Sequence, residues 1–118
     1  MKIYLAGPMS GLPEFNFPAF FAAEEKLHLD GWTVFNPATK EQEKELDAIA
    51  YESGDAKKAI KAGFDFRKCF LWDTQKVIDA DAIYMLPGWQ FSPGASAEHA
   101  VAVAMKRHYP EYQIIYGV

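Results

Sequence analysis

The sequence predicts a single α/β domain over residues 1–118, with an open, mostly parallel sheet of four or five strands and helices on both faces. Short apolar runs rich in β-forming residues alternate with longer helix-prone segments. Glycine, proline or asparagine directly follows each apolar run, which favours a turn there. The chain has 118 residues, 50% of them hydrophobic, so it is long enough to bury a core without disulfides or metals.

The first third of the chain predicts a βαβ unit. Residues 3–6 form an apolar run that ends at a glycine and a proline, which indicates a buried strand and a tight loop. A helix is expected over about residues 17–29, because Pro18 suits its first turn. Residues 32–35 predict a second strand. Strands joined through a helix in this way are parallel.

The second half continues the alternation of helices and strands. A long helix is expected over residues 64–79 and a third strand over residues 82–86. Ser92, followed by a proline, predicts the N-cap of a helix that runs to about residue 107. Residues 113–116 predict the last strand.

This order of elements is typical of a Rossmann-like or flavodoxin-like sheet, in which ligands bind beyond the carboxyl ends of the strands. That edge corresponds here to the loops at residues 7–11, 36–37 and 87–94. Residues 40–61 are rich in Glu, Lys and Ala, which predicts a solvated helical excursion on the rim; a lid over the site is the alternative.

Composition excludes several classes of function. The net charge of -4 provides no basic footprint, so a nucleic-acid polymer is not an expected partner. No apolar run approaches the ~18 residues of a membrane span, and the N-terminal run is too short for a signal peptide. Cys69, the single cysteine, suits a reducing compartment, so a cytoplasmic protein is expected. His28, His99 and His108 are isolated in the sequence, so no metal site is expected.

Two carboxylates fall on apolar helix faces. At about 100° per residue, Asp73 lies within an apolar stripe of its helix, and Glu98 lies opposite the polar side of its own. The apolar neighbours are Phe66, Cys69, Phe70 and Val77 for Asp73, and Val101, Ala102 and Met105 for Glu98. Such acids cost several kcal/mol unless they are paired or line a cavity. A capping or ion-paired acid explains either one alone, but two beside strand-end loops favour a shared cleft. Carboxylates facing one cleft can cut a glycosidic bond.

Candidate binding residues surround the same edge. The first loop allows backbone to approach a ligand closely, although it lacks the ending of a phosphate-binding loop. This loop consists of Gly7, Pro8, Met9, Ser10 and Gly11. Ser92, at a helix start, favours an anion or serves as a plain N-cap. Phe15, Phe17 and Trp89 either stack on a base or pack in the core.

These residues resemble a bacterial and phage group described as nucleoside 2-deoxyribosyltransferase-like, which is related to nucleoside 5′-monophosphate N-glycosidases. The resemblance spans nearly the whole chain apart from residues 40–61. The matching segments are residues 2–11, 15–20, 35–38, 80–82, 86–89, 92–95 and 97–98, together with Asp73. The Pro-Gly-Trp, Ser-Pro-Gly-Ala and Glu series within residues 87–98 is the most specific part.

The resemblance implies roles for individual residues. Glu98 matches the nucleophile of the wider superfamily, and Asp73, eight residues before Asp81, matches the assisting aspartate. Ser92 matches the serine that binds the 5′-phosphate in the hydrolases. Tyr4 and the loop over residues 7–11 match the pocket for sugar and phosphate, and Asn16, Trp89 and Gly94, which stand in the matching segments, complete the expected substrate-binding set. The hydrolases carry an arginine where this loop has Ser10, which leaves nucleoside and 5′-monophosphate substrates both open.

The expected function is therefore cleavage or transfer of the N-glycosidic bond of a (deoxy)nucleoside or its 5′-monophosphate, without metal or organic cofactor. A homodimer or higher homo-oligomer is expected. A nucleotide-binding module without chemistry and an NAD-type glycohydrolase are the alternatives.

Overall fold

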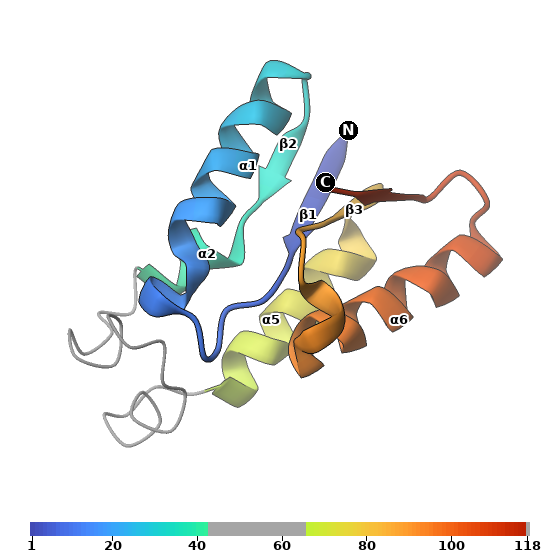
Figure 1. Cartoon of the computed structure of the whole chain (residues 1–118). Coiled ribbons are helices and arrows are strands. Elements are labelled where there is room, and N and C mark those ends of the chain that lie inside the picture. The colour runs from blue at the N-terminus through green and yellow to red at the C-terminus, as the bar shows by residue number, and fades with distance from the viewer. Residues whose placement is uncertain (43–65, 118) are drawn as a thin grey trace.

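A four-stranded parallel sheet lies between helices on its two faces in the computed structural model, which describes residues 1–42 and 66–117 (Figure 1). The strands are β1 (Lys2–Ala6), β2 (Thr33–Phe35), β3 (Ala82–Met85) and β4 (Gln113–Tyr116). Their order is β2-β1-β3-β4, and every neighbouring pair is parallel. The predicted α/β class and parallel sheet are confirmed.

The helices divide between the two faces of the sheet (Figure 1). They are α1 (Phe17–Leu29), α2 (Pro37–Gln42), α5 (Phe66–Asp79) and α6 (Pro93–His108), with short 3-10 turns at Pro13–Asn16 and Trp89–Phe91. α1 covers one face, and α5 and α6 cover the other. None of the described helices combines the length and apolar character needed to cross a membrane.

The alternating side chains of β1 build both cores. Ile3 and Leu5 are fully buried in one cluster together with Phe17 and Phe20 of α1. Tyr4 and Ala6 point to the opposite face, where a second cluster gathers residues of α5, α6 and β3. That cluster includes Val77, Ile83, Met85 and Ala102. A strand buried on both faces is expected of a parallel sheet, and it places Tyr4 beneath the helices that carry the two acids.

Local signals set most helix starts. Pro18 occupies the first turn of α1, as predicted. The Ser92 hydroxyl accepts a hydrogen bond from the Ala95 N–H at 3.2 Å, so Ser92 caps α6 as predicted. A helix begins before the excursion predicted from residue 40, since α2 starts at Pro37, with Asn36 between it and β2. Residues 43–61 of that excursion, and therefore the question of a lid, lie outside the described residues.

Candidate functional site

A cavity of about 810 Å³ lies at the carboxyl ends of the strands. Its lining includes residues 7–10 after β1, Pro37 after β2, and residues 91–95, which lead from the turn after β3 into α6. α5 forms a further wall through residues between 67 and 74. Ligand sites commonly have volumes of ~300–1,000 Å³, and the strand ends are where an open parallel sheet binds ligands. The structure therefore has a cavity at the edge that the sequence indicated.

Glu98 reaches this cavity from inside the core. Its side chain, on α6, is 6% exposed, and it lines the cavity. Tyr4 of β1 is fully buried, and its hydroxyl donates a 2.7 Å hydrogen bond to Glu98 Oε2. Burying a carboxylate is costly unless hydrogen bonds compensate, and the tyrosine hydroxyl provides one. This contact holds the carboxylate in one orientation at the cavity surface.

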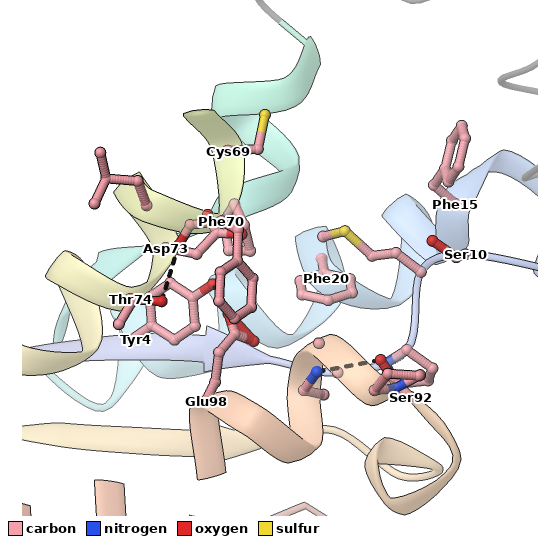
Figure 2. Close-up of a pocket in the computed structure, with 18 of the residues that line it drawn as sticks. Tyr4, Ser10, Phe15, Phe20, Cys69, Phe70, Asp73, Thr74, Ser92 and Glu98 are labelled. Atoms are coloured by element: carbon pink, nitrogen blue, oxygen red, sulfur yellow. Dashed lines mark hydrogen bonds between the residues drawn. The ribbon is translucent and has the colours of Figure 1, made fainter. Parts of the chain in front are cut away.

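Asp73 lines the same cavity from α5. Its side chain is half-buried, and Figure 2 shows that Asp73 and Glu98 come from different helices. The structure thus brings the two acids together at one cavity, although their catalytic roles stay predictions. Phe70, predicted on the buried stripe beside Asp73, is instead 45% exposed, because this part of the stripe faces the cavity rather than the core.

The start of α6 forms another part of the wall. Ser92, Pro93, Gly94 and Ala95 all line the cavity. The Ser92 hydroxyl accepts the Ala95 N–H in the cap, but a hydroxyl oxygen has a second lone pair and a proton for a further partner. Capping and ligand binding by Ser92 are therefore compatible.

A left-handed turn shapes the side of the cavity next to α1. Glu14, Phe15 and Asn16 have φ angles of 56°, 50° and 60°, a conformation that non-glycine residues rarely adopt. The turn places Phe15, only 2% exposed, on the cavity wall. Asn16 Nδ2 donates to the Pro8 carbonyl at 3.0 Å and ties the turn to the loop after β1. The sequence does not mark this turn, since Asn16 alone among the three residues has a left-handed preference.

The predicted substrate-binding residues fall into two groups. Those that line the cavity are Tyr4, Gly7, Pro8, Met9, Ser10, Ser92 and Gly94. Gly11, Asn16 and Trp89 are not part of the lining. Trp89 stacks on His99 with ring centroids 4.2 Å apart, and His99 Nε2 lies 2.8 Å from the Tyr116 hydroxyl. The Trp89 ring therefore packs against protein side chains, and its predicted contact with a base stays a prediction.

Several lining residues were not among the predicted binding residues. α5 contributes Arg67 and Thr74, and the 3-10 turn before α6 contributes Phe91. Arg67 is the one cation among the described lining residues, which also include the carboxylates of Asp73 and Glu98. The wheel of α5 could have identified Thr74, the neighbour of Asp73, but nothing in the sequence marked Arg67.

Within residues 1–42 and 66–117, no group of three or more His, Cys, Asp or Glu side chains is placed to hold a metal ion.

Comparison with known proteins assigns a family without an activity. No curated protein and no solved structure matched the chain. One family model matches residues 1–109, which is most of the chain. The chain therefore belongs to the family described as "Domain of unknown function (DUF4406)".

Proposed function

We propose that this protein cleaves or transfers the N-glycosidic bond of a (deoxy)nucleoside or its 5′-monophosphate. One observation carries the proposal: a buried carboxylate, Glu98, is held by Tyr4 at the surface of a cavity that Asp73 also lines. Most enzymes that cleave glycosidic bonds use a pair of carboxylates that flank the scissile bond.

Glu98 is the proposed nucleophile. The ionised form of a carboxylate is the form that attacks an electrophilic carbon. Tyr4 donates a hydrogen bond to Glu98 from a fully buried position on β1, so the carboxylate is oriented before a substrate binds. Pre-orientation of this kind lowers the entropic cost of reaching the transition state.

The proposed reaction has two displacement steps. A Glu98 oxygen forms a bond to C1′ of the sugar while the C1′–N bond breaks. The electron pair of the C1′–N bond leaves with the base. Asp73 positions the sugar and base and assists departure of the base by giving it a proton. Water, or a ring N–H of a second base, then attacks C1′, returns a proton to Asp73 and releases the Glu98 carboxylate. This retaining route requires carboxyl groups about 5–5.5 Å apart in the substrate complex.

The rest of the lining suits a nucleoside. Aromatic and other apolar side chains provide surfaces for a flat base, and hydroxyl groups provide partners for a sugar. The apolar lining residues that are not buried include Met9, Phe70, Leu71 and Phe91, and the hydroxyl residues that are not buried are Ser10, Thr74 and Ser92.

A panel assay tests the proposal. Nucleosides, their 5′-monophosphates and NAD are incubated with the protein, with and without an acceptor base, and the released base is measured by chromatography. We expect release from at least one nucleoside or 5′-monophosphate and a loss of at least about a hundredfold in Glu98→Gln. Glu111→Gln, which changes an exposed carboxylate outside the cavity, is the matched control. Release that persists unchanged in Glu98→Gln contradicts the proposed nucleophile, and release from NAD alone favours the glycohydrolase alternative.

The Tyr4 contact also leaves a second candidate function, binding of a nucleotide without chemistry. Glu98 is already hydrogen-bonded within the protein, and a carboxylate held in this way can serve recognition alone. Calorimetric binding of a panel member together with no base release under any condition would favour this function.

A further inference from the structure

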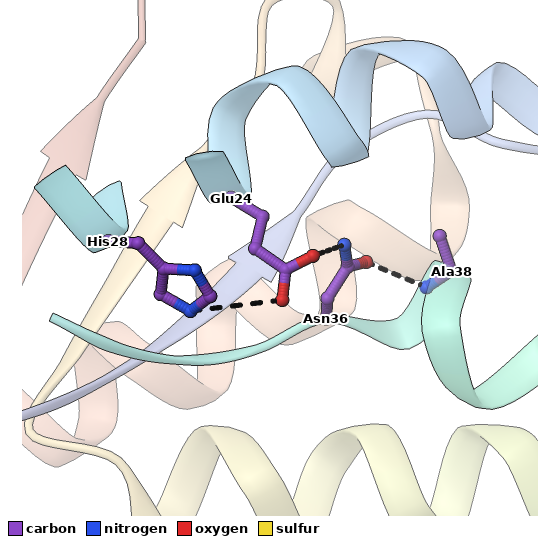
Figure 3. Close-up of polar contacts among 4 residues, drawn as sticks. All are labelled: Glu24, His28, Asn36 and Ala38. Carbon is purple, nitrogen blue, oxygen red and sulfur yellow. Dashed lines mark hydrogen bonds and ion pairs between the residues drawn. The ribbon is translucent and has the colours of Figure 1, made fainter. Parts of the chain in front are cut away.

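A polar contact between α1 and the end of β2 lies outside the catalytic machinery proposed above. Asn36 follows β2, and its side chain is 5% exposed. Asn36 Nδ2 donates to Glu24 Oε2 at 3.0 Å, and Asn36 Oδ1 accepts from the Ala38 N–H at 2.9 Å (Figure 3). The other Glu24 oxygen lies 4.0 Å from Nε2 of His28, which is more exposed than Glu24. Both ends of the buried amide are therefore bonded.

Capping of α2 explains only half of this arrangement. A cap needs an acceptor for the Ala38 N–H, and Ser, Thr or Asp provides one as well as Asn does. The Nδ2 group of Asn36 adds a donor, which is used on the carboxylate of Glu24 from α1. Hydrogen bonds to charged groups are stronger than neutral ones, particularly when one partner is buried. The amide thus ties the corner between β2 and α2 to α1.

Each partner of the Asn36–Glu24 hydrogen bond lies near a residue that lines the cavity. Phe20, four residues before Glu24 and on the same side of α1, lines the cavity. Pro37, the residue after Asn36, lines it as well. Proline has a fixed φ and no N–H, so its placement follows from the backbone of Asn36 and from the first turn of α2, which Asn36 caps.

We propose that Glu24 and Asn36 are a positioning pair that fixes the Phe20 and Pro37 walls of the cavity relative to each other. The pair keeps the cavity closed around the substrate, and this part of the role rests on the proposed function. It touches neither substrate nor reacting atoms, so its effect is on substrate binding and on access to the cavity.

Exchange of the two groups tests the pair. Asn36→Asp keeps the capping acceptor but places a second carboxylate against Glu24. Glu24→Gln is the matched control, because its amide oxygen still accepts from Asn36 Nδ2. The double variant Glu24→Gln/Asn36→Asp restores an amide–carboxylate bond with the partners reversed.

Two measurements follow the cavity wall in these variants. Cys69 is the single cysteine of the chain, is 3% exposed and lines the cavity, so its rate of reaction with Ellman's reagent reports access to the cavity. The KM and kcat of any nucleoside or 5′-monophosphate cleaved in the panel report substrate binding. We expect Asn36→Asp to react about tenfold faster at Cys69 and to raise KM more than it lowers kcat. Glu24→Gln and the double variant are expected to stay near the wild-type values.

The proposed positioning role is overturned if Asn36→Asp leaves the reaction rate of Cys69 unchanged. It is also overturned if the double variant does not return that rate to the wild-type value. It is also overturned if the faster reaction merely equals the change in the unfolding equilibrium constant measured with urea, because a purely structural cap would produce that result. The Cys69 series needs no substrate. If no panel compound is cleaved, the proposed function fails while the Cys69 rates still decide whether the pair positions the wall.

Discussion

The hydroxyl of Tyr4 on β1 donates a 2.7 Å hydrogen bond to Glu98 Oε2 on α6. The two residues are 94 positions apart in the sequence. Both side chains are buried, so the contact links the core of the protein to its cavity. It also sets the orientation of the proposed nucleophile.

Removal of the Tyr4 hydroxyl is expected to affect stability and activity together. Tyr4→Phe leaves the buried carboxylate of Glu98 without this donor, which costs about 1–3 kcal/mol in the free energy of unfolding. The same change is expected to lower kcat of the proposed reaction, because the nucleophile loses its orientation. Urea titration and the base-release assay measure the two effects, with Tyr109→Phe, an exposed tyrosine, as control. Unchanged stability in Tyr4→Phe would contradict the importance of this contact.

Gly7 is expected to tolerate no side chain. A Cβ at Gly7 would lie 2.7 Å from Leu86 Cβ, where the ends of β1 and β3 pack together. Gly7→Ala is therefore expected to lower the free energy of unfolding by about 1–3 kcal/mol through overpacking. Gly94→Ala is the matched control, because nothing lies within 4 Å of a Cβ there and the residue is in the first turn of α6. Equal melting temperatures for the two variants would contradict the close approach.

The left-handed turn before α1 is expected to be strained at Glu14. Left-handed geometry costs roughly 1–2 kcal/mol for a residue with a Cβ, and Glu14 adopts it with φ 56°. Glu14→Gly removes that cost, whereas Glu14→Ala removes the same carboxylate and keeps the Cβ. We expect Glu14→Gly to be more stable than Glu14→Ala by about 1 kcal/mol in urea titration. The reverse order would argue that the turn is not left-handed at this residue.

Tyr112 is expected to make stability depend on alkaline pH. Burial, and secondarily the Asp81 carboxylate, raise the pKa of Tyr112 from 10.0 to about 12, and its hydroxyl donates to the Val77 carbonyl at 2.8 Å. Since the folded-state pKa is the higher one, the folded protein holds the phenol proton more tightly than the unfolded chain. This stabilisation is complete below pH 10 and is lost as the pH rises to about 12.

Unfolding with urea across that pH range measures the effect. Tyr112→Phe is expected to reduce the dependence of unfolding free energy on pH between pH 10 and about 12, relative to the exposed-site control Tyr109→Phe. If the free energy of unfolding falls equally steeply with pH in Tyr112→Phe and Tyr109→Phe, Tyr112 does not titrate with the raised pKa.

Arg67 is expected to distinguish 5′-monophosphates from nucleosides. It is the one cation among the described lining residues, and guanidinium groups pair with phosphate oxygens. If a 5′-monophosphate is the substrate, Arg67→Gln should raise its KM about fivefold or more and leave the KM of the matching nucleoside nearly unchanged. Lys68→Gln removes an adjacent exposed charge that does not line the cavity and is the control. An equal change for both substrates would contradict a phosphate contact by Arg67.

The sequence was sufficient for the order of elements and for part of the site. Apolar runs, turn formers and the Ser92-Pro93 signal act within a few residues, so they predict strands and a helix start without knowledge of the rest of the chain. The helical wheel likewise indicated that Glu98 lies on a buried face, since helix periodicity is a local property.

Only the packed structure determined what those residues meet. Tyr4, which donates to Glu98, lies on another element, Phe70 lines the cavity instead of packing in the core, and Trp89 stacks on His99. The left-handed turn at Glu14 and Phe15 also runs against local preference. Local patterns encode which face of an element is apolar, but the choice of partners depends on how helices from distant parts of the chain pack on the sheet. That choice is a property of the whole core, in which tertiary contacts outweigh local conformational cost.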